Sequence, residues 1–177
     1  MMQDIRSYLT IIQESYTYYN PPEEWVRASI QGEEVNVHWQ KDKNQKNIQK
    51  HEYSLDAAIH ALNDPHAVRI MDDMAKEYRE TTMCRGSDGN ILFVVWSWLD
   101  TGEEITTIRI VSVRKAKPFE ESIYVSSMTP SSKNMIENRV LSEVDKELSP
   151  NVKVEAFGPW FKKMVRHRQH TSSTKKE

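Results

Sequence analysis

The sequence predicts an α+β fold, and three observations support this prediction. Residues 90–116 contain two segments of strand character, joined by a turn at residues 100–103. The first segment is apolar on both faces, as in a strand at the centre of a sheet, and the second is rich in β-branched residues. Segments with apolar residues at helical spacing occur on both sides of this hairpin. The second segment also carries arginines and lysines, so we expect the hairpin to present cations at a surface.

Two helices are predicted ahead of the first strand, over residues 4–19 and 23–30. The first has apolar side chains three or four residues apart, and the second follows prolines that a first helical turn tolerates. Residues 34–39 alternate between polar and apolar, which is typical of a half-buried strand. The other elements expected before the hairpin are helices over 42–50 and 54–63 and strands over 67–71 and 78–85.

The part of the chain after the hairpin is predicted to be mainly helical. A short helix begins at Pro118, because proline is favoured in a first turn. Residues 126–132 have the composition of a linker. The elements expected beyond it are a helix over 134–148, a short strand over 152–157 and a helix over 160–168.

The length of 177 residues fits one domain with appendages. We place this domain at residues 34–126, between a helical N-terminal extension (1–33) and a helical C-terminal extension with a basic tail (127–177). The net charge is −2, so the chain has no overall basic footprint. Any anion site in the domain is therefore expected to be a local cluster of cations.

Cysteine content and hydropathy limit the class of protein. A single cysteine, Cys84, excludes an intramolecular disulfide and a cysteine-based zinc site. The histidines lack metal-ligand spacing and the common nucleotide-binding and nucleophile motifs are absent, so we expect no metal and no cofactor. No apolar run is long enough to cross a membrane, and the N-terminal residues do not resemble a signal peptide. These observations predict a soluble, cytoplasmic protein without a membrane partner.

Ordered fragments between residues 39 and 124 carry a more specific signal. They are Trp39, Lys43, Asn44, Asn47, Lys50 and His51, then Asp64 and Pro65, then Glu77, Arg79 and Gly86, and finally Arg109, Ser112, Arg114, Lys115, Ala116, Glu120 and Tyr124. In order and spacing these fragments resemble the BrnT family, the ribonuclease toxins of type II toxin–antitoxin modules. The chain departs from the family pattern at Gln40 in place of Asp, at Glu52 in place of Gly, and in its two extensions.

The resemblance implies a RelE-like fold, in which helices pack on one face of an antiparallel sheet. It also implies RNA as the substrate and a partner antitoxin called BrnA. We therefore predict an endoribonuclease that needs no metal, in which the ribose 2′-hydroxyl attacks the neighbouring phosphorus.

Such cleavage needs a base, an acid, and cations for the charge that grows on the phosphoryl oxygens. The predicted phosphate clamp is Arg79, Arg109 and Arg114, because a guanidinium can meet two phosphate oxygens at once. The candidates for proton transfer are His51, Glu77 and Tyr124, and the candidates for RNA binding are Lys43, Lys46, Lys50 and Lys115.

Structural roles compete with each of these assignments. Arg109 and Arg114 are five residues apart, so a regular strand would direct them to opposite faces. Both join one site only across a β-bulge, or if Arg114 lies beyond the strand end. His51 and the lysines are alternatively ordinary exposed residues, and Tyr124 with Glu120 is alternatively a docking contact. The alternative ion-pair partners are Glu104, Glu120 or Asp100 for Arg109, and Glu77 or Glu80 for Arg79.

Two other functions fit the same residues. In the first, the chain is a non-catalytic binding or regulatory protein whose extensions form a homodimer or partner interface. In the second, residues 127–177 act as a built-in inhibitor in place of a separate antitoxin, and their deletion raises activity.

Overall fold

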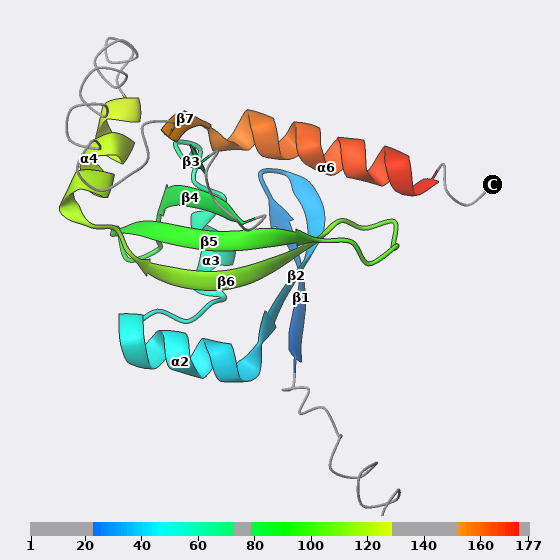
Figure 1. Cartoon of the computed structure of the whole chain (residues 1–177), viewed down its shortest axis with the longest axis horizontal. Helices are drawn as coiled ribbons and strands as arrows, with labels where there is room; N and C mark the ends of the chain where they lie inside the picture. Colours follow the sequence, from blue (N-terminus) through cyan, green and yellow to red (C-terminus); the bar gives the residue numbers. More distant parts are fainter. Residues whose placement is uncertain (1–22, 73–78, 129–151, 174–177) are drawn as a thin grey trace, which may run out of the picture.

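The computed structural model describes residues 23–72, 79–128 and 152–173 and confirms an α+β fold (Figure 1). The strands are β1 (Glu23–Ile30), β2 (Glu33–Gln40), β3 (Val68–Asp72), β4 (Glu80–Arg85), β5 (Ile91–Leu99), β6 (Thr107–Lys115) and β7 (Val152–Ala156). The helices in this part of the chain are α2 (Lys41–His51), α3 (Ala57–Ala61), α4 (Pro118–Ser127) and α6 (Phe157–Ser173). The strands form one seven-stranded sheet in the order β1-β2-β6-β5-β4-β3-β7. Neighbouring strands are antiparallel except β2 and β6, which are parallel.

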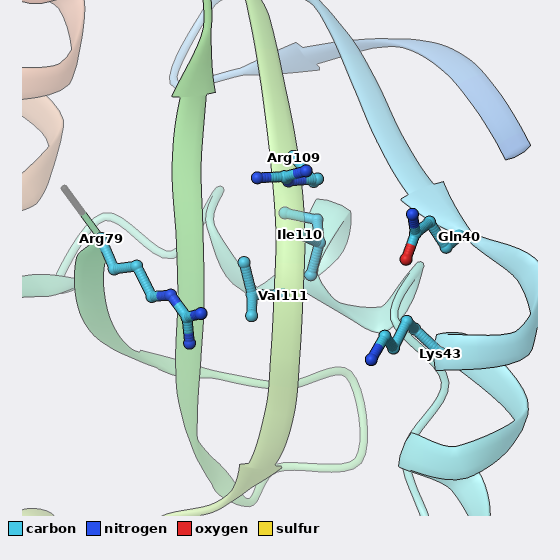
Figure 2. Close-up of a pocket in the computed structure, with 6 residues that line it drawn as sticks. All are labelled: Gln40, Lys43, Arg79, Arg109, Ile110 and Val111. Carbon is cyan, nitrogen blue, oxygen red and sulfur yellow. The ribbon is translucent and has the colours of Figure 1, made fainter. Parts of the chain in front are cut away.

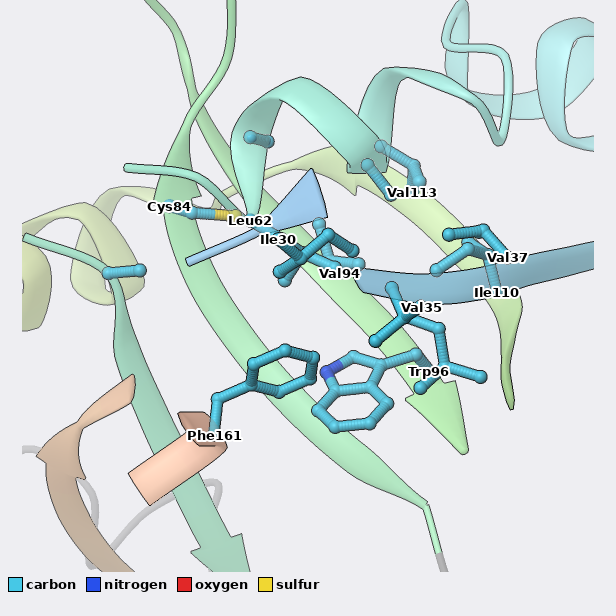
Figure 3. Packing of buried hydrophobic residues seen from close by; sticks show 14 of the residues in the cluster. Ile30, Val35, Val37, Leu62, Cys84, Val94, Trp96, Ile110, Val113 and Phe161 are labelled. Carbon is cyan, nitrogen blue, oxygen red and sulfur yellow. The ribbon is translucent and has the colours of Figure 1, made fainter. Parts of the chain in front are cut away.

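Strand β5 occupies the middle of the sheet, as its apolar residues on both faces predict. On one face, Leu92, Val94 and Trp96 pack in a buried cluster with side chains of α3 and α6 (Figure 3). On the opposite face, Ile91 belongs to a second cluster that includes Tyr124 of α4. Helices therefore cover parts of both faces, whereas the resemblance implied helices on one face.

The prediction of a helix over residues 23–30 is wrong, because this segment is strand β1. It pairs antiparallel with β2 along its whole length. The two residues between the strands, Gln31 and Gly32, have φ angles of 54° and 82°. Positive φ at both positions is typical of the two-residue type I′ turn, whose twist matches that of a hairpin. Strand pairing thus overrides the weak helical pattern.

The other predicted elements differ mainly in their ends. The helix predicted over 54–63 is confined to Ala57–Ala61, and the last helix begins three residues earlier than predicted, at Phe157. The helices predicted over 4–19 and 134–148 lie outside the described residues.

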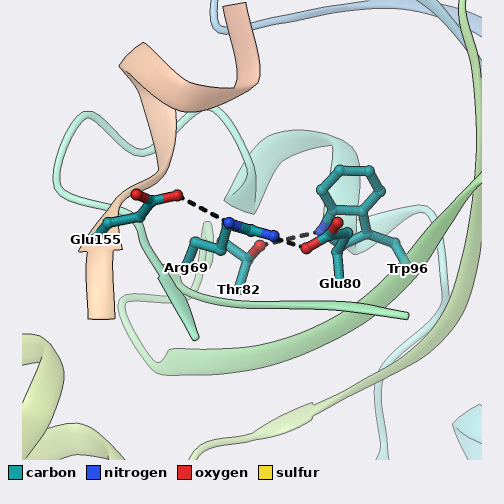
Figure 4. Close-up of polar contacts among 5 residues, drawn as sticks. All are labelled: Arg69, Glu80, Thr82, Trp96 and Glu155. Carbon is teal, nitrogen blue, oxygen red and sulfur yellow. Dashed lines mark hydrogen bonds and ion pairs between the residues drawn. The ribbon is translucent and has the colours of Figure 1, made fainter. Parts of the chain in front are cut away.

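The C-terminal elements pack into the same core as the central hairpin. Strand β7 pairs with β3 at one edge of the sheet. Arg69 of β3 donates hydrogen bonds to Glu80 of β4 and Glu155 of β7, both at 2.8 Å, so one guanidinium joins three neighbouring strands (Figure 4). Phe161 of α6 is fully buried, and its ring meets Trp96 edge-on. Strand β7 is therefore held by strand pairing and an ion pair, and helix α6 by apolar contacts with the core.

Helix α2 takes the place of a strand along the outer part of β6. Strand β2 pairs with β6 only where residues 36–38 meet residues 107–109, and α2 runs beside the rest of β6 (Figure 1). The buried amide of Asn47 donates to the carbonyl oxygen of Val113 at 2.7 Å and to that of Tyr53 at 2.8 Å. Its oxygen accepts a hydrogen bond from the Val113 N–H at 3.3 Å. Asn47 therefore satisfies the free edge of β6 as a neighbouring strand would.

We expect Asn47→Ala to lower the free energy of unfolding by at least about 2 kcal/mol, because it leaves buried backbone groups of β6 without partners. Gln45→Ala is the matched control, since Gln45 is an exposed residue of the same helix. Urea unfolding of both variants measures the difference. Equal stability of the two variants would contradict this role for Asn47.

Glu52 follows α2 in a left-handed conformation, with φ of 64°, and its N–H donates to the Ile48 carbonyl at 2.9 Å. Glycine adopts this conformation without steric cost, and the family pattern has glycine here. We expect Glu52→Gly to raise the free energy of unfolding by about 1 kcal/mol. Gln49→Gly, in the interior of α2, should instead lower it by about 1 kcal/mol. Thermal unfolding of both variants tests the contrast, and a destabilised Glu52→Gly protein would contradict it.

Candidate functional site

A β-bulge in β6 brings two arginines onto one face of the sheet. The register between β5 and β6 skips Val111, which is left as an extra residue on β6. As a result Arg109 and Arg114 pair with Ser97 and Phe93, which are four residues apart on β5 and therefore share a face. The bulge is one of the two conditions under which both arginines could join one site.

A cavity of about 340 Å³ lies on this face of the sheet, within the size range of ligand pockets. It is lined by Gln40, Lys43, Arg79, Arg109, Ile110 and Val111. The three charged side chains come from the start of α2, from the residue before β4 and from β6, and Figure 2 shows them around Val111. Among the described residues all charged side chains that line the cavity are cations, so it suits an anion.

The side chain of Arg109 is exposed and makes no hydrogen bond or ion pair within the described part of the chain. The ion pair considered for it with Glu104, Glu120 or Asp100 is therefore not formed there. Burial is the main cause that lowers the pKa of the neighbouring His38 imidazole, and the charge of Arg109 adds to it. Arg109 thus has its guanidinium available at the cavity.

Arg114 has a different role, although it shares the face with Arg109. Its guanidinium binds both carboxylate oxygens of Glu120, at 2.8 and 2.7 Å, and lies 3.9 Å from the centre of the Phe93 ring. Glu120 is nearly fully buried and also accepts the Lys117 N–H at 2.7 Å. Arg114 therefore fastens α4 to β6, and it does not line the cavity.

Tyr124 is also held in a structural contact. It is fully buried, and its hydroxyl donates to Asp64 at 2.6 Å. Burial and this hydrogen bond raise the pKa of Tyr124 to about 12. Asp64 in turn accepts the Arg85 N–H at 2.7 Å. The hydroxyl is thus engaged in joining α4 to the segment between α3 and β3, which Asp64 in turn links to the end of β4.

The remaining candidates are spread along α2 and beyond it. His51 ends α2, and burial followed by the charges of Lys50 and Arg114 lowers its pKa below 6.5. It is eight residues from Lys43, or about 12 Å along the helix axis. Lys46 is exposed and lies 3.8 Å from Asp42. Lys50 and Lys115 are exposed at the ends of α2 and β6, and Glu77 lies outside the described residues.

His38 is a neighbour of the site that was not among the predicted site residues. It pairs with Arg109 across β2 and β6 and is almost fully buried. Burial lowers its pKa despite the nearby Glu23 carboxylate, so the imidazole is neutral at pH 7. The alternation of residues 34–39, with Val35 and Val37 inward, already directs His38 to the other face. This alternation was the sequence signal that could have placed His38 on the face of the site.

In residues 23–72, 79–128 and 152–173, no three His, Cys, Asp or Glu side chains lie together as metal ligands would. In the same residues no helix is both long and apolar enough to cross a membrane.

Fold and site together define an α+β protein with a cationic pocket on an open sheet face. Residues 39–120, a little under half of the chain, match the family described as the ribonuclease toxin BrnT of type II toxin–antitoxin systems. This match confirms the resemblance seen in the sequence, and it contains every residue that lines the cavity. No curated protein matches the chain.

Proposed function

We propose that this protein is an endoribonuclease toxin that cleaves RNA without a metal and is controlled by a partner antitoxin similar to BrnA. The observation that carries the proposal is the cavity of Lys43, Arg79 and Arg109, which lies within the segment that matches the toxin family. Cations around a cavity suit a phosphodiester, because they neutralise the charge that grows on its oxygens during cleavage.

Side chains from three segments of the chain bind the phosphate in this proposal. Arg109 offers an exposed guanidinium that no ion pair within the described residues occupies. Arg79 and Lys43 line the same cavity, on either side of Val111 (Figure 2). Three cations around one site can contact all the non-bridging oxygens of a phosphate in the transition state. Lys46, Lys50 and Lys115 are then exposed charges that attract the RNA from outside the cavity.

Proton transfer needs a group close to the bound phosphate. Tyr124 is engaged with Asp64, and His51 lies about 12 Å along α2 from Lys43. We therefore retain Glu77 as the base, since it precedes Arg79 by two residues in the sequence. Glu77→Gln is expected to lower kcat by about 10²- to 10⁴-fold.

The pH dependence separates His51 from Glu77. The pKa of His51 is lowered from 6.5, so a His51 base would give activity that rises with pH through a midpoint below that value. We expect the profile of His51→Asn between pH 5 and 8 to match that of the wild type. Loss of an acidic limb in His51→Asn would instead assign proton transfer to His51.

Cleavage of a defined RNA in EDTA tests the proposed reaction. Attack by the 2′-hydroxyl leaves a 2′,3′-cyclic phosphate end, which mass spectrometry identifies. We expect this product from the full chain, and co-expression of an antitoxin should suppress it. If the full chain binds RNA but cleaves none, the non-catalytic binding protein would be favoured.

A further inference from the structure

Trp25 of β1 is an exposed aromatic residue outside the segment that matches the toxin family. Trp25 is 51% exposed, although tryptophan is usually well buried. The indole lies over the His38 ring, with centroids 4.4 Å apart and planes inclined by 38°. One ring face thus rests on the protein while much of the side chain stays open to solvent.

Strand pairing places Trp25 beside the cationic cavity. Trp25 is opposite His38 in the β1–β2 pair, and His38 is opposite Arg109 in the β2–β6 pair. Residues that are directly opposite on neighbouring strands share a face, and strands lie about 4.8 Å apart, so Trp25 and Arg109 are about 10 Å apart at the backbone. The aromatic ring and the phosphate-binding cation therefore lie on one continuous surface.

His38 supports the Trp25 indole from below, and Glu23 lies beside His38. His38 is almost fully buried, and its Nε2 lies 3.3 Å from a Glu23 carboxylate oxygen. The buried imidazole therefore gives the indole a fixed surface to pack against. A pre-oriented ring loses little conformational entropy when a ligand stacks on it.

We propose that Trp25 is a stacking site for one base of single-stranded RNA whose phosphate occupies the cavity of Lys43, Arg79 and Arg109. This inference rests on the proposed function and names its substrate class. Aromatic rings next to a cationic groove are how proteins bind unpaired nucleotides, since every base offers a π face. A duplex hides its base faces, so the site selects single strands.

Binding of an uncleavable 2′-O-methyl oligonucleotide tests the stacking site directly. Trp25→Ala should weaken binding of the single strand roughly 5- to 150-fold, the effect of losing one stacked base, whereas Trp25→Phe should retain most of the affinity. Val26→Ala is the matched control, because Val26 is an exposed apolar neighbour on the opposite face of β1. Affinity for a duplex of the same length should be unchanged in Trp25→Ala.

The outcomes separate this inference from the proposed function. Single-strand binding that Arg109→Gln weakens and Trp25→Ala does not would overturn the stacking site and leave the phosphate site standing. Lack of RNA binding by the wild type would overturn both. Unchanged RNA affinity in Trp25→Ala, with conversion of a dimer to a monomer in light scattering, would assign Trp25 to a protein interface instead.

Discussion

A chain that lacks residues 129–177 is expected not to fold. Phe157, Phe161 and Val165 of α6 are fully buried in the same cluster as Trp96 and Leu92 of the central strand. Removing β7 and α6 would expose this cluster and leave Arg69 without its Glu155 partner. Circular dichroism and urea unfolding of the truncated chain would show no cooperative transition.

The same expectation can be tested by a single substitution. Phe161→Ala should lower the free energy of unfolding by about 3–5 kcal/mol, as is usual for a buried phenylalanine. Lys162→Ala, at the next and exposed position, should change it by no more than about 0.5 kcal/mol. A truncated chain that folds and cleaves RNA faster than the full chain would instead support the interpretation of residues 127–177 as a built-in inhibitor.

Arg109→Ala is expected to lower kcat for RNA cleavage by about 10²- to 10³-fold, the effect of removing one group that stabilises transition-state charge. The stability should be nearly unchanged, because Arg109 is exposed and makes no ion pair within the described residues. Lys162→Ala serves as a control for a change of charge on a different element. A rate within threefold of the wild type would remove Arg109 from the phosphate site.

Arg114→Ala is expected to lower stability and not the cleavage rate of the folded protein, the reverse of Arg109→Ala. It leaves the buried Glu120 carboxylate without the guanidinium that now binds both its oxygens. Breaking a buried ion pair costs about 3–5 kcal/mol, so this variant should lose stability first. Any loss of activity in it is expected to follow the loss of folded protein.

Much of the fold was predictable because local pattern and final position agree. Strand β5 is apolar on both faces and is central, and α4 begins at the proline that the sequence marks. Strand β1 was not predictable in this way. Its pairing with β2 depends on a Gln31–Gly32 turn at positive φ, while its own residues fit helix and strand almost equally well.

The site could be predicted only in part, because sequence spacing does not show which cations are already paired. Arg109 and Arg114 look alike on β6, yet one lines the cavity and the other is bound to Glu120. The bulge at Val111 decides that they share a face, and it leaves no clear mark in the sequence. His38 was missed because its importance comes from its neighbours on other strands, Trp25 and Arg109. The RelE-like classification stays a prediction.

The measurement that tests the central claim most directly is the affinity of an uncleavable single-stranded RNA for the wild type and for Arg109→Gln at several salt concentrations. If the cavity binds phosphate, the variant should bind more weakly, and its slope of log affinity against log salt should be about 0.7 smaller, as for one lost contact on a single strand. Lys162→Gln should show the wild-type slope. Equal affinity and equal slopes for all three proteins would contradict a phosphate site at Lys43, Arg79 and Arg109.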